Sequence, residues 1–305
     1  MLFAVVSVKN DYTRPVINMS GKLYLKDSRH PVVEALLHDA PFVPNDVDMD
    51  MNDDRVAIIT GPNMAGKSTF MRQTAIITIM AQAGCFVPAA VAEIGIVDAI
   101  FTRVGASDDL SAGQSTFMIE MAEVADILKN ATKNSLIIFD EIGRGTSTFD
   151  GMSIARAVLE YVHDKKLVGA KTMFATHYHE LTALEDQLPG VKNFNIAVKK
   201  RGDDITFLRR IVRGGADDSF GIEVAKLAGV PDKVIRRAKQ VLAELEETGG
   251  EGLRPTHHRF SEEPVQLTMD TVDGEVLQKL RNLDVNSLTP IQCMNTLFEL
   301  CSMLK

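Results

Sequence analysis

The sequence has little cysteine and no long apolar run, and both absences narrow the class of protein. Its three cysteines, Cys85, Cys293 and Cys301, form no C-x-x-C pair, so a reduced protein without a disulfide framework is expected. No apolar stretch reaches the roughly 18 residues that a transmembrane helix needs, and the first residues lack the positive charge of a secretory signal. We therefore expect a cytoplasmic protein with no membrane partner.

An excess of positive charge is also missing, since the formal net charge is −8 at pH 7. That value argues against a broad electrostatic grip on DNA or on an anionic membrane, although it leaves room for a local contact. The hydrophobic share of 45% and the charged share of 24% are ordinary for a globular protein. A chain of 305 residues can hold one large domain or two smaller ones.

The strongest chemical signal is a glycine-rich turn between an apolar strand at 56–59 and a helix. It has the pattern Gly-x4-Gly-Lys-Ser of a phosphate-binding loop. Its glycines let successive N–H groups point at phosphate oxygens, and the helix N-terminus adds about half a positive charge. Lys67 is expected to reach the β- and γ-phosphates and Ser68 to bind Mg²⁺, whereas an ordinary strand–turn–helix corner would not need the lysine. The candidate nucleotide-binding residues here are Gly61, Pro62, Asn63, Met64, Ala65, Gly66, Lys67, Ser68 and Thr69.

A second signal is the apolar strand 135–139, which ends in Asp140 and Glu141. Two carboxylates at the end of a buried strand are costly unless a cation or hydrogen-bond donors compensate them. We expect Asp140 to hold Mg²⁺ and Glu141 to orient or deprotonate the water that hydrolyses ATP. A further strand at 171–176 ends at His177, which could sense the γ-phosphate. A metal site built from His177 and His179 is the competing interpretation.

Two further candidates have structural alternatives of similar weight. Phe42 shortly precedes the strand of the phosphate-binding loop and could stack on adenine, or it could be a core phenylalanine. Ser115 stands at the start of a helix, where its hydroxyl and the free N–H groups could bind an anion or where it could simply cap the helix. The apolar face of that helix consists of Phe117, Met121, Val124 and Leu128.

Strands alternate with helices from 56 to 184, which predicts an α/β fold with a largely parallel sheet flanked by helices. The phosphate-binding and acidic groups would then meet at the carboxyl ends of the strands. An antiparallel pair is expected at 191–198 and 205–211. Residues 219–247 predict a helix–turn–helix, which could read DNA or pack against a partner. We favour packing, because the second helix becomes acidic toward its end. The first helix is expected to bury Ile222, Val224, Ala225 and Leu227.

These patterns divide the chain into five expected segments. They are a lead-in with an adenine-contacting β region at 1–54, a P-loop ATPase core at 55–213 and a helix–turn–helix dimerisation segment at 214–247. A flexible linker at 248–264 and a helical oligomerisation segment at 265–305 follow. Thr289 as N-cap and Pro290 at the first helical position are expected to start the last helix.

Three stretches together resemble one family. Residues 61–69, 140–151 and 174–181 are similar to the MutS family of DNA mismatch repair ATPases, and the similarity runs from about 10 to 247. The resemblance implies an ABC-type P-loop ATPase that hydrolyses ATP to ADP and phosphate with Mg²⁺. It also implies a homodimer with the nucleotides at the subunit interface, and MutL and mismatched DNA as partners of the full-length protein.

The resemblance also implies roles for single residues. Phe42 would stack on adenine, Asn63 and Lys67 would hold phosphates, and Ser68 and Asp140 would serve Mg²⁺. Glu141 would act on the water, His177 would be the switch histidine, and Ser115 would meet the γ-phosphate bound by the other subunit. Segment 219–247 would be the dimer-packing element. Ala65 departs from the family, since many members have glycine there, a change that the backbone should tolerate.

The domains with which this family reads a mismatch and clamps DNA, including a Phe-x-Glu wedge, do not occur in these residues. We therefore expect a piece of a longer protein that covers the ATPase and C-terminal parts and shows no mismatch preference. One alternative is the nucleotide-binding subunit of an ABC transporter, because 110–114 resembles the transporter signature. That stretch lies 30 residues before Asp140, however, and the turn at 62–64 fits the MutS family better. The other alternative is a non-hydrolysing ATP-dependent dimerisation module, against which Glu141 speaks.

Overall fold

The computed structural model describes residues 2–37, 40–62, 65–104, 115–201, 204–215, 220–247, 291–292 and 294–296. The chain divides into two compact units, residues 1–241 and 242–305. The expected linker at 248–264 and nearly all of the expected tail at 265–305 lie outside the described residues. The predicted site residues Asn63 and Met64 lie outside them as well.

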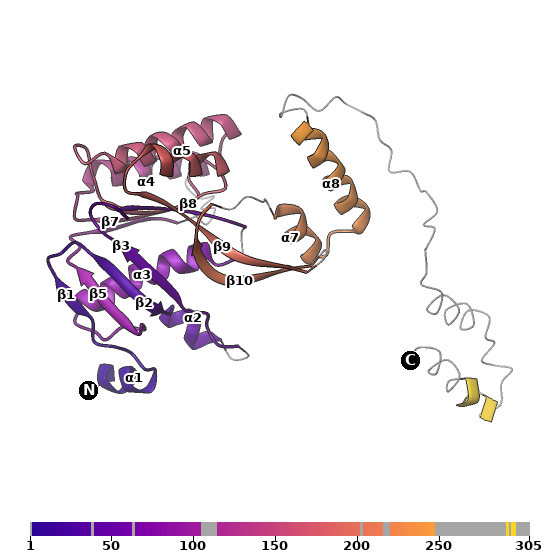
Figure 1. The fold of residues 1–305 in the computed structure, drawn as a ribbon, viewed down its shortest axis with the longest axis horizontal. Coiled ribbons are helices and arrows are strands. Elements are labelled where there is room, and N and C mark those ends of the chain that lie inside the picture. The colour runs from indigo at the N-terminus through magenta and orange to yellow at the C-terminus, as the bar shows by residue number, and fades with distance from the viewer. Residues whose placement is uncertain are drawn as a thin grey trace. The chain divides into compact units, whose positions relative to one another are not determined.

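A six-stranded sheet of order β10-β9-β4-β8-β7-β6 forms the centre of the first unit (Figure 1). Its strands are β4 (Val56–Thr60), β6 (Ile100–Arg103), β7 (Leu136–Asp140), β8 (Lys171–Ala175), β9 (Val191–Arg201) and β10 (Asp204–Arg213). All neighbouring strands pair in parallel except β9 and β10, which are antiparallel. Every residue of β4, β7 and β8 is buried, as expected for parallel strands covered on both faces. The predictions of a mixed α/β fold and of the antiparallel pair are confirmed.

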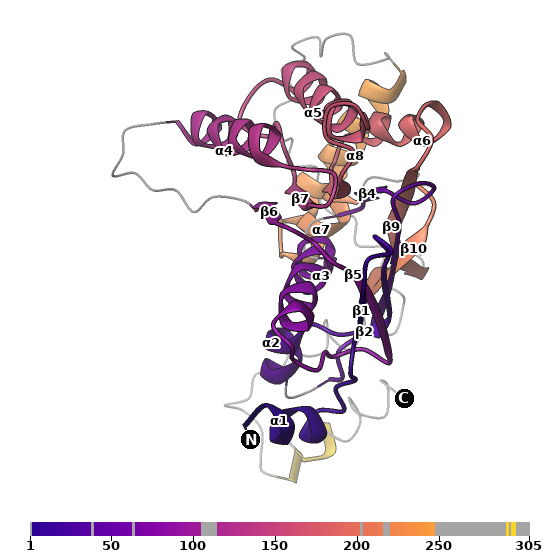
Figure 2. The same ribbon diagram turned by 90° about the vertical axis from the view of Figure 1, so that its left-hand side faces the viewer.

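Helices cover both faces of this sheet, with α3 (Lys67–Gln82) on one side and α4 (Thr116–Asn130) and α5 (Thr148–His163) on the other (Figures 1 and 2). Strand β4 contributes alternate residues to the two cores, because successive side chains of a strand point to opposite faces. Ala57 and Ile59 pack in the core that contains α3, whereas Val56 and Ile58 pack in the core that contains α4 and α5. The sheet is therefore anchored on both sides, and its strand ends are held in place.

A second, four-stranded sheet of order β1-β5-β2-β3 shares the core with α3. It consists of β1 (Val16–Asn18), β2 (Leu23–Ser28), β3 (Asn45–Met49) and β5 (Val91–Gly95). The alternation that predicts a strand at 22–26 is confirmed, since Leu23 and Leu25 are fully buried while Tyr24 between them is not. Helices α1 (Leu2–Lys9) and α2 (Pro31–Leu36) complete this part of the chain, and η2 (His179–Ala183) and α6 (Leu184–Gln187) connect β8 to β9.

The expected helix–turn–helix is present as α7 (Gly221–Leu227) and α8 (Asp232–Glu247), the latter running across the boundary between the units. Gly229 ends α7 in the left-handed region, with φ of 87°. Its N–H donates to Lys226, and that of Val230 donates to Ala225, the two bonds of a Schellman motif.

The prediction that α7 buries four apolar side chains was wrong. None of its residues is buried, and Leu227 is 62% exposed. The sequence pattern shows which residues are apolar and share a face, but it does not show whether the surface that covers them belongs to the same chain.

Candidate nucleotide-binding site

Charged side chains predicted to act on phosphate and water meet at the carboxyl ends of three adjacent strands. Lys67 follows β4, Glu141 follows β7 and His177 follows β8, and these strands lie in the order β4-β8-β7. Nζ of Lys67 lies 3.4 Å from Oε1 of Glu141, an oxygen that Nε2 of His177 also contacts. Nη1 of Arg144 lies 2.6 Å from the other oxygen, Oε2. Three basic side chains thus surround one carboxylate.

The surroundings of Glu141 favour its ionised form. Burial alone would raise the pKa of this carboxyl, but the hydrogen bond and charge of His177 outweigh that effect, helped by the charges of Lys67 and Arg144. The pKa of Glu141 is therefore lower than the ordinary value for glutamate. The backbone of Glu141 has φ of 63°, in the left-handed region that non-glycine residues rarely adopt. A carboxylate held ionised on strained backbone is typical of a functional position.

The phosphate-binding loop has the backbone that its glycines predict. Gly61 and Gly66 have φ of 125° and 113°, which favour glycine. A Cβ at Gly66 would have no atom within 4 Å, so backbone conformation and not space requires glycine there. Lys67 is 3% exposed and its ammonium donates to the carbonyl of Gly61. Burial lowers the pKa of Lys67, although the nearby charge of Glu141 opposes this. Pro62 and Ala65 are buried beside it.

Asp140 has an oxygen that suits a cation. Its Oδ1 is buried and has no hydrogen-bond partner among the described residues, and its Oδ2 lies 4.0 Å from Nη2 of Arg72. An uncompensated buried carboxylate oxygen is costly, so a hard cation with a preference for oxygen ligands fits this position. Ser68, the other predicted magnesium ligand, is half-buried at the start of α3.

A cavity of about 230 Å³ adjoins the phosphate-binding loop. It is lined by Val33, Leu37, Phe42, Val43, Asn45, Gly66, Thr69, Phe70, Gln73 and Arg209. Because Gly66 and Thr69 belong to both, the cavity and the loop form one continuous surface. Phe42 is only partly buried and faces this cavity. The structure therefore places Phe42 beside the phosphate-binding loop, on the wall of the same cavity.

Arg209 lines the same cavity, and the sequence interpretation missed it. The register of β10 against β9 shifts between Phe207 and Ile211, and Arg209 has φ of 55° within this irregularity. Buried Asn45 holds the irregular segment, since its Nδ2 donates to the carbonyl of Arg209 at 3.0 Å and its Oδ1 accepts from the N–H of Ile211 at 2.7 Å. A bond between such distant residues leaves no local pattern that could have revealed it.

Ser115 caps α4. Its Oγ accepts a hydrogen bond from the N–H of Met118 at 3.1 Å, which confirms the capping interpretation, and its side chain is exposed. Ser115 makes no polar contact with Lys67 or Glu141 in the described structure. The apolar face predicted for this helix is confirmed, with Val124 buried and Phe117, Met121 and Leu128 partly buried.

The competing metal interpretation of His177 and His179 gains no support. Among the residues that the structure describes, no group of three or more His, Cys, Asp or Glu side chains is placed to hold a metal ion. Within the same residues, none of the helices has the length and apolar character needed to cross a bilayer.

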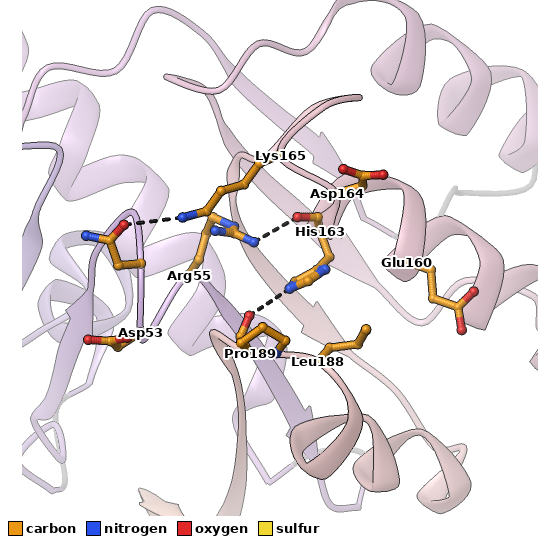
Figure 3. Close-up of a pocket in the computed structure, with 9 residues that line it drawn as sticks. Asp53, Arg55, Glu160, His163, Asp164, Lys165, Leu188 and Pro189 are labelled. Atoms are coloured by element: carbon orange, nitrogen blue, oxygen red, sulfur yellow. Dashed lines mark hydrogen bonds between the residues drawn. The ribbon is translucent and has the colours of Figure 1, made fainter.

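A larger cavity of about 610 Å³ lies near the amino ends of β4 and β9 and contains none of the predicted site residues (Figure 3). Its polar groups bond to one another across chain segments. Nη2 of Arg55 donates to the carbonyl of His163 at 2.8 Å, and Nε2 of His163 lies 2.8 Å from the carbonyl of Pro189. Nζ of Lys165 donates to Oδ1 of Asn52 at 3.3 Å. These bonds tie the loop before β4 to the end of α5, which is a structural role.

The family model described as MutS domain V matches residues 57–246. Over 302 residues the chain is 56% identical to the DNA mismatch repair protein MutS of Caldicellulosiruptor bescii, which is 98% of this chain and 35% of that protein. The MutS protein of Caldicellulosiruptor saccharolyticus is 57% identical over 98% of this chain and 35% of its own length. That of Methanococcoides burtonii is 53% identical over 97% of this chain and 35% of its own length. The chain belongs to the MutS family.

The chain spans about a third of the length of these MutS relatives. The match to MutS domain V includes the phosphate-binding loop, Glu141 and His177, and it extends through α7 and most of α8. Phe42, which approaches the loop from the other sheet region, precedes the matched residues. The resemblance that the three sequence stretches carry is thereby confirmed.

Proposed function

We propose that this chain binds and hydrolyses ATP and dimerises, as the ATPase module of a MutS-type DNA mismatch repair protein. One observation carries the proposal. Lys67 after β4 and the acids Asp140 and Glu141 at the end of β7 lie at the same edge of the sheet, on either side of β8, and a cavity continuous with the phosphate-binding loop adjoins them. Ligands of parallel α/β sheets bind at this edge. The fold is then that of an ABC-type P-loop ATPase.

The adenine moiety occupies the cavity between Phe42 and Arg209. Both residues line it, and Phe42 offers a flat apolar face for stacking. The triphosphate then follows the loop from Gly61 to Thr69, which includes Pro62, Asn63, Met64, Ala65 and Gly66. Lys67 has its ammonium at the start of α3 and binds the β- and γ-phosphates there.

The metal position follows from Asp140, whose Oδ1 has no hydrogen-bond partner among the described residues. Asp140 and Ser68 would hold Mg²⁺, which neutralises charge on the phosphate oxygens when bound. Glu141 orients the attacking water and accepts its proton as the water oxygen bonds to the γ-phosphorus and the bond to the ADP oxygen breaks. The lowered pKa of Glu141 keeps the carboxylate available for this step. His177, on the same carboxylate, senses the γ-phosphate.

Completion of the site by a second copy is the second part of the proposal. Ser115 is exposed at the N-terminus of α4 and makes no polar contact with Lys67 of its own chain, which leaves it available to the γ-phosphate bound by the other copy. Exposed Leu227 of α7, with half-buried Ile222 and Val224 on the same helix, supplies an apolar surface for that copy. In this scheme 1–54 contacts adenine, 55–213 is the ATPase core, 214–247 dimerises, 248–264 links and 265–305 oligomerises.

We propose that mismatched DNA and MutL are binding partners of the full-length protein and not of this chain alone. We place that protein in the cytoplasm. The net charge of −8 agrees with a chain that makes no broad contact with DNA by itself. Filter binding to matched and mismatched duplexes tests this, with equal weak binding expected. A clear preference of this chain for the mismatched duplex contradicts the assignment.

Substitution of Glu141 by Gln tests the hydrolytic part. Loss of the base should lower the ATP turnover rate by about 100-fold or more. ATP binding, followed by a fluorescent nucleotide, should persist because Lys67 and the loop are intact. An unchanged rate in Glu141→Gln refutes the role of Glu141. A wild-type chain that binds ATP without turnover would instead be a non-hydrolysing dimerisation module.

Sedimentation velocity with and without ATP and Mg²⁺ tests the composite site. A site completed by the other copy predicts tighter self-association when nucleotide is bound. If the sedimentation coefficient does not respond to nucleotide at any protein concentration, each copy encloses its own nucleotide and the role of Ser115 is wrong.

A further inference from the structure

Glu120, on the second turn of α4, is a buried carboxylate that no motif singles out. Its Oε1 accepts a hydrogen bond from the N–H of Gly143 at 2.6 Å. The carbonyl of the same Gly143 accepts from Oη of Tyr178 at 3.0 Å. Gly143 is therefore held at both backbone polar groups, by a helix on one side and by the residue after His177 on the other.

Gly143, the residue held in this way, lies two residues after Glu141, whose backbone is strained. A non-glycine residue with φ of 63° keeps that conformation only if its surroundings hold the chain on both sides. On the side of Glu141 itself, its N–H donates to the carbonyl of Ala175 at 3.0 Å. On the following side, Ile142 is buried and Gly143 is held by Glu120.

The same contacts fix α4 to the loop that follows β7. A Cβ on Gly145 would lie 2.8 Å from Cβ of Phe117, so the loop passes against the first turn of α4 with no space between them. Arg103 is buried at the end of β6. Its Nη2 lies 3.5 Å from Oε2 of Glu120, and its Nε lies 3.0 Å from Oε2 of Glu123. Ser115 and Glu120 are thus parts of one helix that is bonded to the Glu141 loop.

We propose that Glu120 is a positioning residue that acts through the backbone of Gly143 to hold the Glu141 carboxylate in its working orientation. The proposal rests on the role given to Glu141 above, because a carboxylate that does not act on water needs no such support.

Glu123 provides a matched control for the experiment. Both carboxylates pair with Arg103, but only Glu120 bonds to Gly143, and the side chain of Glu123 is 47% exposed. Single-turnover ATP hydrolysis with the full chain in excess over ATP separates the chemical step from nucleotide binding, which is measured independently.

Glu120→Ala should lower the single-turnover rate by about 10- to 100-fold, the range typical of residues that orient an active group. The dissociation constant for ATP should stay within about 3-fold, because no nucleotide contact is lost. Glu120→Gln keeps an acceptor oxygen for Gly143 and should recover most of the rate. Glu123→Gln should behave as wild type.

Three outcomes would overturn the proposal. They are a rate unchanged in Glu120→Ala, a Glu123→Gln rate as low as that of Glu120→Ala, and equal losses in Glu120→Ala and Glu120→Gln. If Glu120→Ala does not fold, Tyr178→Phe probes the other bond to Gly143 and should lower the rate by about 2- to 10-fold at unchanged ATP affinity. An unchanged rate in Tyr178→Phe then refutes the proposal. Glu141→Gln distinguishes a failure of the proposed function from a failure of the role given to Glu120. A normal rate in Glu141→Gln refutes the proposed function itself, and the role of Glu120 with it.

Discussion

Nζ of Lys67 and Oε1 of Glu141 lie 3.4 Å apart, and their side chains are only 3% and 13% exposed. The lysine proposed to bind phosphate and the carboxylate proposed to act on water therefore pair with each other. Under the proposed function, a γ-phosphate would compete with Glu141 for Lys67, and binding of ATP would then release the carboxylate toward water. His177 and Arg144 contact the same carboxylate, so the pKa of Glu141 depends on them as well.

Arg144→Gln should shift the pH dependence of ATP hydrolysis. Arg144 helps to hold the pKa of Glu141 below its ordinary value, with the carboxylate as the active form. Removing a positive charge near a carboxyl group raises the pKa of that group. The acidic limb of kcat/KM should therefore move to higher pH, while the rate on the plateau changes less. The measurement is kcat/KM against pH, which reports groups of the free enzyme. Circular dichroism at each pH must show that both chains stay folded, and a limb that moves to lower pH or stays in place contradicts the assignment.

Phe42→Ala should weaken nucleotide binding without changing the chemical step. Loss of one stacking platform should raise the dissociation constant for ATP and ADP by about 5- to 150-fold, which corresponds to about 1–3 kcal/mol for base stacking on an aromatic ring. The single-turnover rate at saturating ATP should stay near that of wild type. Phe42→Tyr keeps the ring and serves as the matched control. If Phe42→Ala and wild type bind ATP with equal affinity, Phe42 does not stack on adenine and has only a structural role.

Two glycines with similar positive φ but different neighbours allow a comparison of stability. Gly143 and Gly84 have φ of 88° and 83°, but only at Gly143 would a Cβ lie 2.5 Å from a backbone oxygen, that of Gly151. Gly84→Ala should cost about 1–2 kcal/mol, the price of a left-handed non-glycine residue. Gly143→Ala adds overpacking of about 1–3 kcal/mol. Urea unfolding of both variants measures the difference, and equal losses would mean that the loop yields easily around Gly143.

Arg55→Met should destabilise the fold and leave ATP hydrolysis intact. Buried Arg55 donates to the carbonyls of Met51 and His163, and each carbonyl left without a donor costs about 1–3 kcal/mol. Lys165→Met, on the same cavity but exposed and with a single bond of 3.3 Å, should change the free energy of unfolding by less than about 0.5 kcal/mol. Thermal unfolding and turnover of both variants check this. A large loss of turnover in a folded Arg55→Met chain would show that the cavity in Figure 3 serves the reaction.

Local patterns were sufficient where chemistry and structure follow from neighbouring residues. The apolar runs before Gly61 and Asp140 predicted buried strands, and both are buried along their whole length. The alternation around Tyr24 and the stripe around Val124 likewise predicted a strand and a helix that the structure contains. The first two features follow from continuous apolar runs, and the other two follow from a period of two or of 3.6 residues, all of which a single stretch of sequence displays.

The site as a whole needed more than such patterns. Arg209 joins Phe42 only because Asn45 holds an irregular segment of β10, and Glu120 supports Glu141 only because α4 packs against the loop after β7. The pattern in α7 was misread for a related reason, since it says nothing of which surface covers Leu227.

The amino-acid sequence by itself determined the phosphate-binding loop, the acids at the end of their strand and the succession of strands and helices, because these depend on backbone freedom, burial and periodicity within a few residues. Tertiary structure alone decided which residues meet across the strand ends, which backbone carries strain at Glu141 and which side chains hold it. Such contacts join residues far apart in the chain, and they arise from strand order and packing that no local pattern encodes.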